Sequence, residues 1–180
     1  FVQTTKQNSS VILSQLIQNE QVKNEKKIDW VSSTFLVTVH LVAILGFFTF
    51  SWPALFLALA LHWVTGGFGI TLCYHRLLTH RSFKVVKPLE YFLALLGVLA
   101  CQTGPITWVA AHRLHHAESD KEMDPHSPLK GFFWAHMGWC MVSSSNIDSL
   151  EAKKRYAPDL FNDRGHQFLE KTLILWTLLL

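Results

Sequence analysis

The stretch VSSTFLVTVHLVAILGFFTFSWPALFLALALHWVTGGFGITLCY, residues Val31–Tyr74, contains no Asp, Glu, Lys or Arg. All 29 charged side chains of the 180-residue chain lie outside these 44 residues, and 49% of the chain is hydrophobic. A water-soluble domain distributes charge over all its surface elements, so an uncharged stretch of this length indicates contact with lipid. We therefore predict an all-α membrane protein.

The uncharged stretch divides into two helices at Ser51-Trp52-Pro53. Val31–Phe50 has 20 residues and Pro53–Tyr74 has 22, and a helix needs about 20 apolar residues to cross ~30 Å of hydrocarbon. Trp52 suits the membrane interface and Pro53 suits the first turn of a helix. This pattern predicts a hairpin of two transmembrane helices, 31–50 and 53–74.

Basic residues on both flanks of the hairpin predict that its two ends lie on the cytoplasmic side. Residues 1–30 then form a polar cytoplasmic segment, and 75–170 form a cytoplasmic-side helical cap. Tyr91–Cys101 is apolar over only 11 residues, which favours an interfacial helix near 89–101 rather than a span. Residues 171–180 are predicted to begin a third transmembrane helix that is cut off at the C-terminus.

The remaining composition excludes several classes of protein. A formal net charge of +3 is too small and too scattered for nucleic-acid binding. The three cysteines are widely spaced without a C-x-x-C pair, which argues against a disulfide-stapled domain or a cysteine-based zinc module. The unusual count is histidine, with ten residues.

Five histidines fall in two tight clusters, His75 with His80, and His112 with His115 and His116. On an α-helix the second cluster occupies one face, because positions i+3 and i+4 lie within ~60° of position i. His75 and His80 are ~140° apart on an ideal α-helix. They can share a site only where the helix ends or kinks; otherwise each serves a different metal.

Imidazoles gathered on one face are natural metal ligands. Ligation by nitrogen alone excludes Ca²⁺ and Mg²⁺ and leaves iron, zinc or copper. The two clusters can share a site only if they lie on the same side of the membrane. This is a second reason, besides its short length, to predict that the apolar segment between them does not cross the membrane.

HRLLTHR (His75–Arg81), HRLHH (His112–His116) and ESDKEMDPHSPLKGFFWAHMGW (Glu118–Trp139) resemble the membrane fatty acid desaturase family. The likeness is nearest to its delta-9 branch, which includes the stearoyl-CoA desaturases. It is closer to the cyanobacterial acyl-lipid type than to the animal enzymes.

The resemblance implies an O₂-dependent desaturase that places a cis double bond, at delta-9, in a long saturated acyl chain. It implies a di-iron centre, with His75, His80, His112, His115 and His116 as ligands. The family's third box, His-x-x-His-His, is expected after Leu180. The chain is thus expected to be an N-terminal fragment with an incomplete, inactive site.

Other residues are candidates for supporting roles. Gln102 and Trp108 match positions that line the acyl tunnel, although a capping Gln and an interfacial Trp explain them equally well. Asp120, Asp124 and His126 could orient ligands or could be solvated loop residues. Outside the boxes, we expect His40 and His62 to bond between helices, His136 to be structural, and His166 to be a surface residue.

An external reductant is required, because no flavin or nicotinamide fingerprint is present. The resemblance suggests ferredoxin for a cyanobacterial or plastid-like enzyme in the thylakoid or plasma membrane, and a small haem protein for an endoplasmic-reticulum enzyme. The acyl carrier is expected to be a lipid, with acyl-CoA as the second choice. The alternatives are a histidine-box hydroxylase or sterol-type oxidase, and a zinc-dependent membrane hydrolase.

Overall fold

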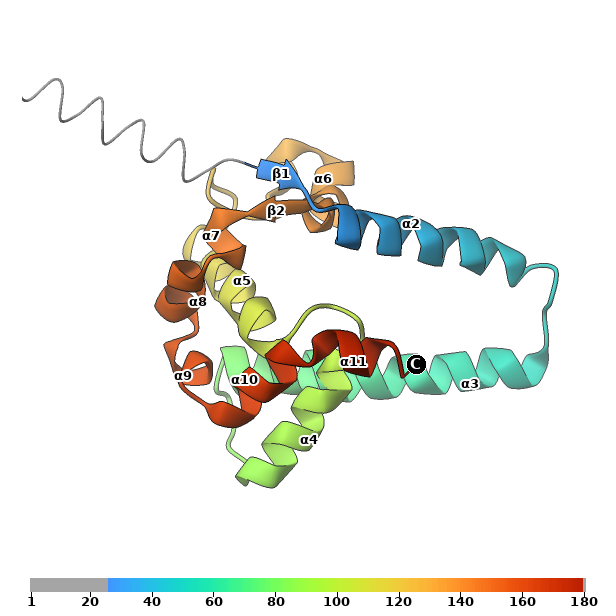
Figure 1. Ribbon diagram of the computed structural model, residues 1–180, viewed down its shortest axis with the longest axis horizontal. Coiled ribbons are helices and arrows are strands. Elements are labelled where there is room, and N and C mark those ends of the chain that lie inside the picture. Colours follow the sequence, from blue (N-terminus) through green and yellow to red (C-terminus); the bar gives the residue numbers. More distant parts are fainter. Residues whose placement is uncertain (1–25, 180) are drawn as a thin grey trace, which may run out of the picture.

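In the computed structural model, which describes residues 26–179, most of the chain is helical (Figure 1). The elements follow in chain order as β1 (Lys26–Ile28), α2 (Trp30–Leu45), α3 (Trp52–His62), the π-helix η1 (Trp63–Thr79), α4 (Lys87–Val98), α5 (Pro105–Ala117), the 3₁₀-helix η2 (Pro128–Lys130), α6 (Phe132–His136), the 3₁₀-helix η3 (Gly138–Met141), β2 (Val142–Ser144), α7 (Ser145–Asp148), α8 (Leu150–Tyr156), α9 (Pro158–Phe161), α10 (Arg164–Lys171) and α11 (Leu173–Thr177).

The long apolar stretch forms two helical arms. Asp29 caps α2 by accepting hydrogen bonds from the first-turn N–H groups, and Ser51 caps α3, which has Pro53 in its first turn. The helix α3 continues into η1 without a break, from Trp52 to Thr79. Among residues 26–179, this 28-residue helix is the one that is long and apolar enough to cross a membrane.

The first arm is shorter than the sequence predicts. The helix α2 ends at Leu45 and is followed by a turn at 46–48, where the prediction continued the helix to residue 50. Figure 1 shows α2 and α3 extending away from the rest of the chain and joined at their far end. Their large apolar side chains are mostly exposed, for example Leu41 at 61% and Phe56 at 64%. An apolar surface of this size is typical of contact with lipid or with other protein.

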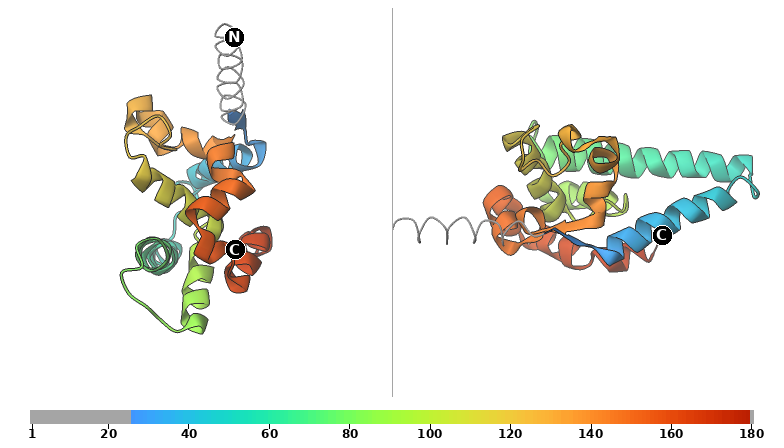
Figure 2. Two further views of the ribbon diagram at one scale, coloured as in Figure 1. Left: turned by 90° about the vertical axis from the view of Figure 1, so that its left-hand side faces the viewer. Right: turned by 90° about the horizontal axis from the view of Figure 1, so that it is seen from above.

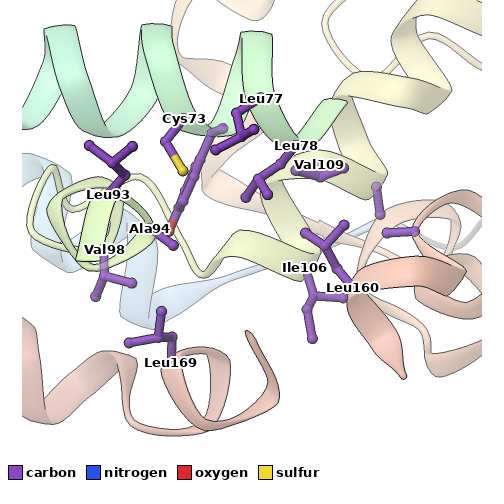
Figure 3. Packing of buried hydrophobic residues seen from close by; sticks show 13 residues of the cluster. Cys73, Leu77, Leu78, Leu93, Ala94, Val98, Ile106, Val109, Leu160 and Leu169 are labelled. Atoms are coloured by element: carbon purple, nitrogen blue, oxygen red, sulfur yellow. The ribbon is translucent and has the colours of Figure 1, made fainter. Parts of the chain in front are cut away.

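The core lies where η1, α4 and α5 meet (Figure 3). Cys73, Leu77 and Leu78 of η1 pack there with Leu93 of α4 and Val109 of α5. Each side chain of this size contributes about 1.5–3 kcal/mol when it is fully buried. The core therefore fixes the helices that carry the two histidine clusters.

A glycine permits the closest approach between η1 and α4. A Cβ atom added at Gly69 would lie 2.4 Å from the backbone N of Gly97 and 2.4 Å from the carbonyl carbon of Leu96. Any side chain here would separate the two helices, because a small residue is what allows their backbones to approach so closely.

The helix α5 lies between η1 on one side and α8 and α10 on the other (Figure 2). Glu170 of α10 caps the N-terminus of α5 by accepting hydrogen bonds from the backbone N–H groups of Ile106 and Thr107. A carboxylate stabilises a helix N-terminus because it satisfies free donors and complements the helix dipole.

A short antiparallel sheet corrects the all-α prediction. β1 pairs with β2 in the register Lys26↔Ser144 and Ile28↔Val142, and the N–H of Asp29 donates to the carbonyl of Met141 at 2.9 Å. Strands of three residues carry almost no periodic signal, so they could not be recognised in the sequence.

Candidate metal centre

His75 and His80 lie on the same side of η1. The N–H of His80 donates to the carbonyl of His75 at 3.0 Å, the i→i+5 bond of a π-helix. The wider turn of the π-helix brings residues i and i+5 to the same side of the helix, whereas an α-helix would hold them ~140° apart. The two Nε2 atoms lie 3.1 Å apart. The difficulty raised by the i, i+5 spacing is therefore resolved by a change of helix type.

His112 and His116 lie one turn apart on α5. Their Nε2 atoms are 3.2 Å apart, and each ring also faces η1. The ring centroids of His75 and His112 are 4.9 Å apart, and those of His80 and His116 are 4.8 Å apart. One nitrogen from each of the four rings lies within 4.8 Å of all the others. The two histidine boxes thus converge on one point.

The convergence fits a single metal ion. Nitrogen ligands lie about 2.1 Å from a transition metal, which places neighbouring ligand atoms of a tetrahedral site about 3.4 Å apart. The Nε2–Nε2 distances of 3.1 and 3.2 Å are close to this value. Four neutral imidazole nitrogens are a donor set for iron, zinc or copper and not for Ca²⁺ or Mg²⁺.

His115 points elsewhere, although it belongs to the same box. Its Nδ1 lies 3.0 Å from Oδ1 of Asp124, whose side chain has no exposed surface. Its ring centroid lies 4.2 Å from that of His126. His115, Asp124 and His126 form a second group whose ligand atoms lie within 4.8 Å of one another. With Nδ1 engaged by Asp124, Nε2 is the nitrogen that His115 can offer to a metal.

Asp124 organises the loop after α5. Its carboxylate also accepts hydrogen bonds from the backbone N–H groups of Asp120 and His126, at 3.0 and 3.1 Å. Burial alone would raise the pKa of Asp124, but these bonds and the one with His115 lower it overall. Asp120 contacts Asp124 through its backbone, while its own side chain is exposed. Of the three predicted supporting residues, Asp124 and His126 thus place their side chains beside His115.

Burial lowers the pKa of two imidazoles on α5, those of His112 and His116. It lowers the pKa of His112 to about 3, with a further contribution from the neighbouring His116. The pKa of His116 is lowered for the same reason, with His80 as its strongest neighbour, and that of His126 by burial and by His115. Neutral imidazole is the form that binds metal, so these side chains are in their ligating state at neutral pH.

Trp108 and Gln102 lie beside the four-histidine cluster. The indole ring of Trp108 is 4.8 Å from the ring of His112 and 5.6 Å from that of Tyr74. Its Nε1 donates to Oε1 of Gln102 at 3.4 Å. Trp108 therefore lies against the cluster, and Gln102 is joined to the cluster through Trp108.

A third polar group corrects the prediction that His166 is a surface residue. His166 is 1% exposed, and its Nε2 lies 2.9 Å from Oε1 of Glu90. The ammonium of Lys87 bridges Glu90 and Asp163, at 2.8 Å from each. Since a lysine ammonium already occupies the space between the two carboxylates, this group is a structural network between α4 and α10.

His40 also differs from expectation. Its Nδ1 lies 2.7 Å from the carbonyl oxygen of Leu36, one turn earlier in α2, so it bonds within its own helix and not between helices. His136 stacks on Phe132 within α6, with ring centroids 5.6 Å apart, as suits a structural residue.

Comparison with known proteins gives matches to fatty acid desaturases. The chain is 48% identical over 150 residues to the sn-1 stearoyl-lipid 9-desaturase of Anabaena variabilis, covering 82% of this chain and 54% of that protein. It is 42% identical over 149 residues to delta-9 acyl-lipid desaturase 1 of Arabidopsis thaliana, covering 83% of this chain and 48% of that protein. It is 45% identical over 160 residues to an acyl-CoA 5-desaturase of Anemone leveillei, covering 83% of this chain and 49% of that protein.

The chain thus spans about half the length of the curated relatives that it matches. No family model matches it.

Proposed function

The chain belongs to the membrane fatty acid desaturase family, and from this premise we propose that it supplies two histidine boxes of an O₂-dependent acyl desaturase. The enzyme introduces a cis double bond at delta-9 of a long saturated acyl chain. The observation that carries the proposal is the convergence of His75, His80, His112 and His116 on one point.

Iron is the metal that suits this chemistry. An unactivated methylene has neither an acidic proton nor a leaving group, so acid–base or nucleophilic side chains cannot attack it. Bound iron supplies the redox chemistry with O₂ that the removal of two hydrogens from adjacent carbons requires. The four histidines would hold one iron ion.

His115 would serve the second iron of a di-iron centre. Its Nε2 is directed by the bond between Nδ1 and Asp124, an arrangement that fixes the tautomer and the orientation of a metal-binding histidine. His126 lies against His115 and Asp120 supports the loop. Further ligands of a di-iron centre would come from outside these two boxes.

The acyl chain would approach the iron from the side of Trp108 and Gln102. Trp108 contacts the ring of His112, a ligand of the four-histidine cluster, and its apolar face suits a methylene chain. The matched relatives are named for acyl-lipid and for acyl-CoA substrates. We favour an acyl-lipid, because the Anabaena and Arabidopsis proteins named for it are delta-9 enzymes.

The membrane arrangement follows from the two apolar arms. The helix α2 and the continuous helix α3–η1 would form the two-span hairpin, with α4 at the interface and the histidine clusters in the cytoplasmic-side cap. Lys84 and Lys87 follow the second arm and suit the cytoplasmic side. Residues 171–180 would enter the membrane again.

This placement puts the cluster within reach of a water-soluble electron donor, ferredoxin or a small haem protein. The membrane would be the thylakoid or plasma membrane in a cyanobacterial or plastid-like setting, and the endoplasmic reticulum in an acyl-CoA setting.

Expression of a full-length desaturase that contains residues 1–180, in a host without delta-9 desaturation, tests the proposal. We expect monounsaturated fatty acids with the double bond at carbon 9, in the lipid fraction, and their loss in a His112→Ala variant. A hydroxylated product would instead indicate the histidine-box hydroxylase. Stoichiometric zinc in protein from iron-replete cells, with no O₂ dependence, would indicate the hydrolase.

A further inference from the structure

Arg113 lies in the second histidine box but takes no part in the cluster of imidazoles. Its side chain is 18% exposed and turns toward α8 and α9. Nη1 donates to Oδ1 of Asp159 at 2.6 Å, and Nη2 donates to Oδ2 of the same carboxylate at 3.1 Å. A two-point pair of this kind holds a guanidinium in one orientation.

The same guanidinium reaches two backbone carbonyls on other elements. Nη2 donates to the carbonyl of Leu78 in the last turn of η1, at 2.7 Å, and Nη1 donates to the carbonyl of Tyr156 in α8, at 3.0 Å. The carbonyls in the last turn of a helix need partners outside the helix. Leu78 lies between His75 and His80, so one end of this link is the first histidine box itself.

Asp159 also forms an ion pair with a second arginine, which belongs to the first histidine box. Nη2 of Arg81, the residue after His80, lies 2.7 Å from Oδ2 of Asp159. Arg81 has a backbone φ of 51°, which is uncommon for a residue other than glycine. Its side chain is 64% exposed, so this pair is weaker than the one made by Arg113.

We propose that Arg113 and Asp159 are positioning residues that hold the two histidine boxes at metal-binding distance. The proposal rests on the proposed function, because it takes the four histidines as ligands of one ion. The physical reason is that His75 lies in η1 and His80 directly follows it, whereas His112 and His116 belong to α5. The bond from Arg113 to the Leu78 carbonyl joins these two helices directly, and Asp159 fixes the direction in which Arg113 reaches.

Lysine cannot reproduce this arrangement. The Arg113 guanidinium serves a carboxylate and two carbonyls on three elements at once, whereas a lysine ammonium is a compact charge without the planar fork. Arg113→Lys therefore keeps the charge and loses the geometry. Asp159→Asn keeps the shape and loses the charge, and Asp159→Glu restores the charge on a longer side chain.

The test is a Co²⁺ titration of the 180-residue chain in mild detergent, followed by the visible absorption of His-ligated Co²⁺ and by thermal unfolding of the metal-free protein. We expect Arg113→Lys and Asp159→Asn to weaken Co²⁺ binding about 10- to 100-fold, the range found for groups that orient ligands, and to change the shape of the absorption band. Asp159→Glu should recover part of the affinity.

Asp163→Asn is the matched control. Asp163 also carries a cationic partner, but it joins α10 to α4, neither of which bears a ligand. We expect it to lower the unfolding temperature without changing Co²⁺ affinity. Wild-type affinity in Arg113→Lys and Asp159→Asn, or an equal loss in Asp163→Asn, would overturn the positioning role. Failure of the unmodified chain to bind Co²⁺ would instead count against the four-histidine site itself.

Discussion

The Nδ1 atom of His115 lies 3.0 Å from the fully buried carboxylate of Asp124, while the neighbouring ring of His116 faces away toward His80. Two adjacent histidines of one box thus serve different groups. The division follows from the helix, because consecutive residues of an α-helix are ~100° apart around its axis. Asp124 determines where His115 points, so it controls the second group without contributing to the first.

Replacement of Asp124 by Asn is expected to destabilise the chain by about 1.5–3 kcal/mol, the usual contribution of a hydrogen bond to a charged group. The amide keeps the shape but faces N–H donors with one oxygen instead of a carboxylate. Urea unfolding in detergent micelles measures the change. Asp120→Asn is the control, since Asp120 is exposed and contacts Asp124 only through its backbone N–H. The stability of this variant should stay within about 0.5 kcal/mol of the parent. Equal effects of the two substitutions would contradict this account.

Replacement of His80 by Ala is expected to abolish stabilisation by metal. A ligand present at 100 times its Kd raises the free energy of unfolding by about 2.7 kcal/mol, and we expect Co²⁺ to do so for the parent chain. His136→Ala removes a histidine that stacks on Phe132 in α6, and it should keep the full metal effect. The measurement is the unfolding midpoint with and without Co²⁺. A metal effect that survives in His80→Ala would remove His80 from the ligand set.

The sequence was informative where physical signals are local. Absence of charge located the two apolar arms, and residue spacing located the histidine boxes, because both properties are read over a few consecutive turns. The position of His115 depended on a carboxylate nine residues away, and no periodicity indicates such a partner. The π-helix likewise could not be predicted, since the i, i+5 pair is compatible with a kink, a helix end or two separate metals.

Long-range partners explain the other differences. His166 was predicted to be a surface residue, yet a hydrogen bond with Glu90, 76 positions earlier, satisfies the buried imidazole. Asp159 carries no signal at all in the sequence, because its role depends on Arg113, 46 positions away. These pairings exist only after the helices have packed.

Acid is expected to destabilise the metal-free chain between about pH 4 and pH 2. Burial opposes ionisation of Asp163, but its bonds with Lys87, with the N–H of His166 and with Tyr91 lower its pKa to about 2. Because the folded pKa lies below the ordinary value of 3.8, the stabilisation is complete above pH 4 and is lost as the pH falls through 2. The loss is about 2 kcal/mol for this group.

The free energy of unfolding, measured at a series of pH values, shows the effect of Asp163. The Asp163→Asn variant should have a flatter profile between pH 4 and pH 2, and Glu151→Gln, which changes an exposed carboxylate of α8, should follow the parent. A profile for Asp163→Asn as steep as the parent's would show that this carboxylate is not linked to folding.

Replacement of Gly69 by Ala is expected to destabilise the contact between η1 and α4. The new Cβ would lie 2.4 Å from the backbone of residues 96 and 97, so the helices must move apart, because backbone atoms cannot rotate away as a side chain does. Overpacking of this kind costs about 1–3 kcal/mol. Gly67→Ala is a control on the same helix, since its Cβ would meet the Trp63 ring at 4.0 Å, an ordinary contact.

The two glycine variants also separate packing from metal binding. The C-terminal end of η1 carries His75 and is followed by His80, so a shift of η1 relative to α4 and α5 should weaken Co²⁺ binding in Gly69→Ala together with its loss of thermal stability. Gly67→Ala should leave both properties close to those of the parent chain. Unchanged unfolding and unchanged Co²⁺ affinity in Gly69→Ala would show that α4 does not press against η1 at this position.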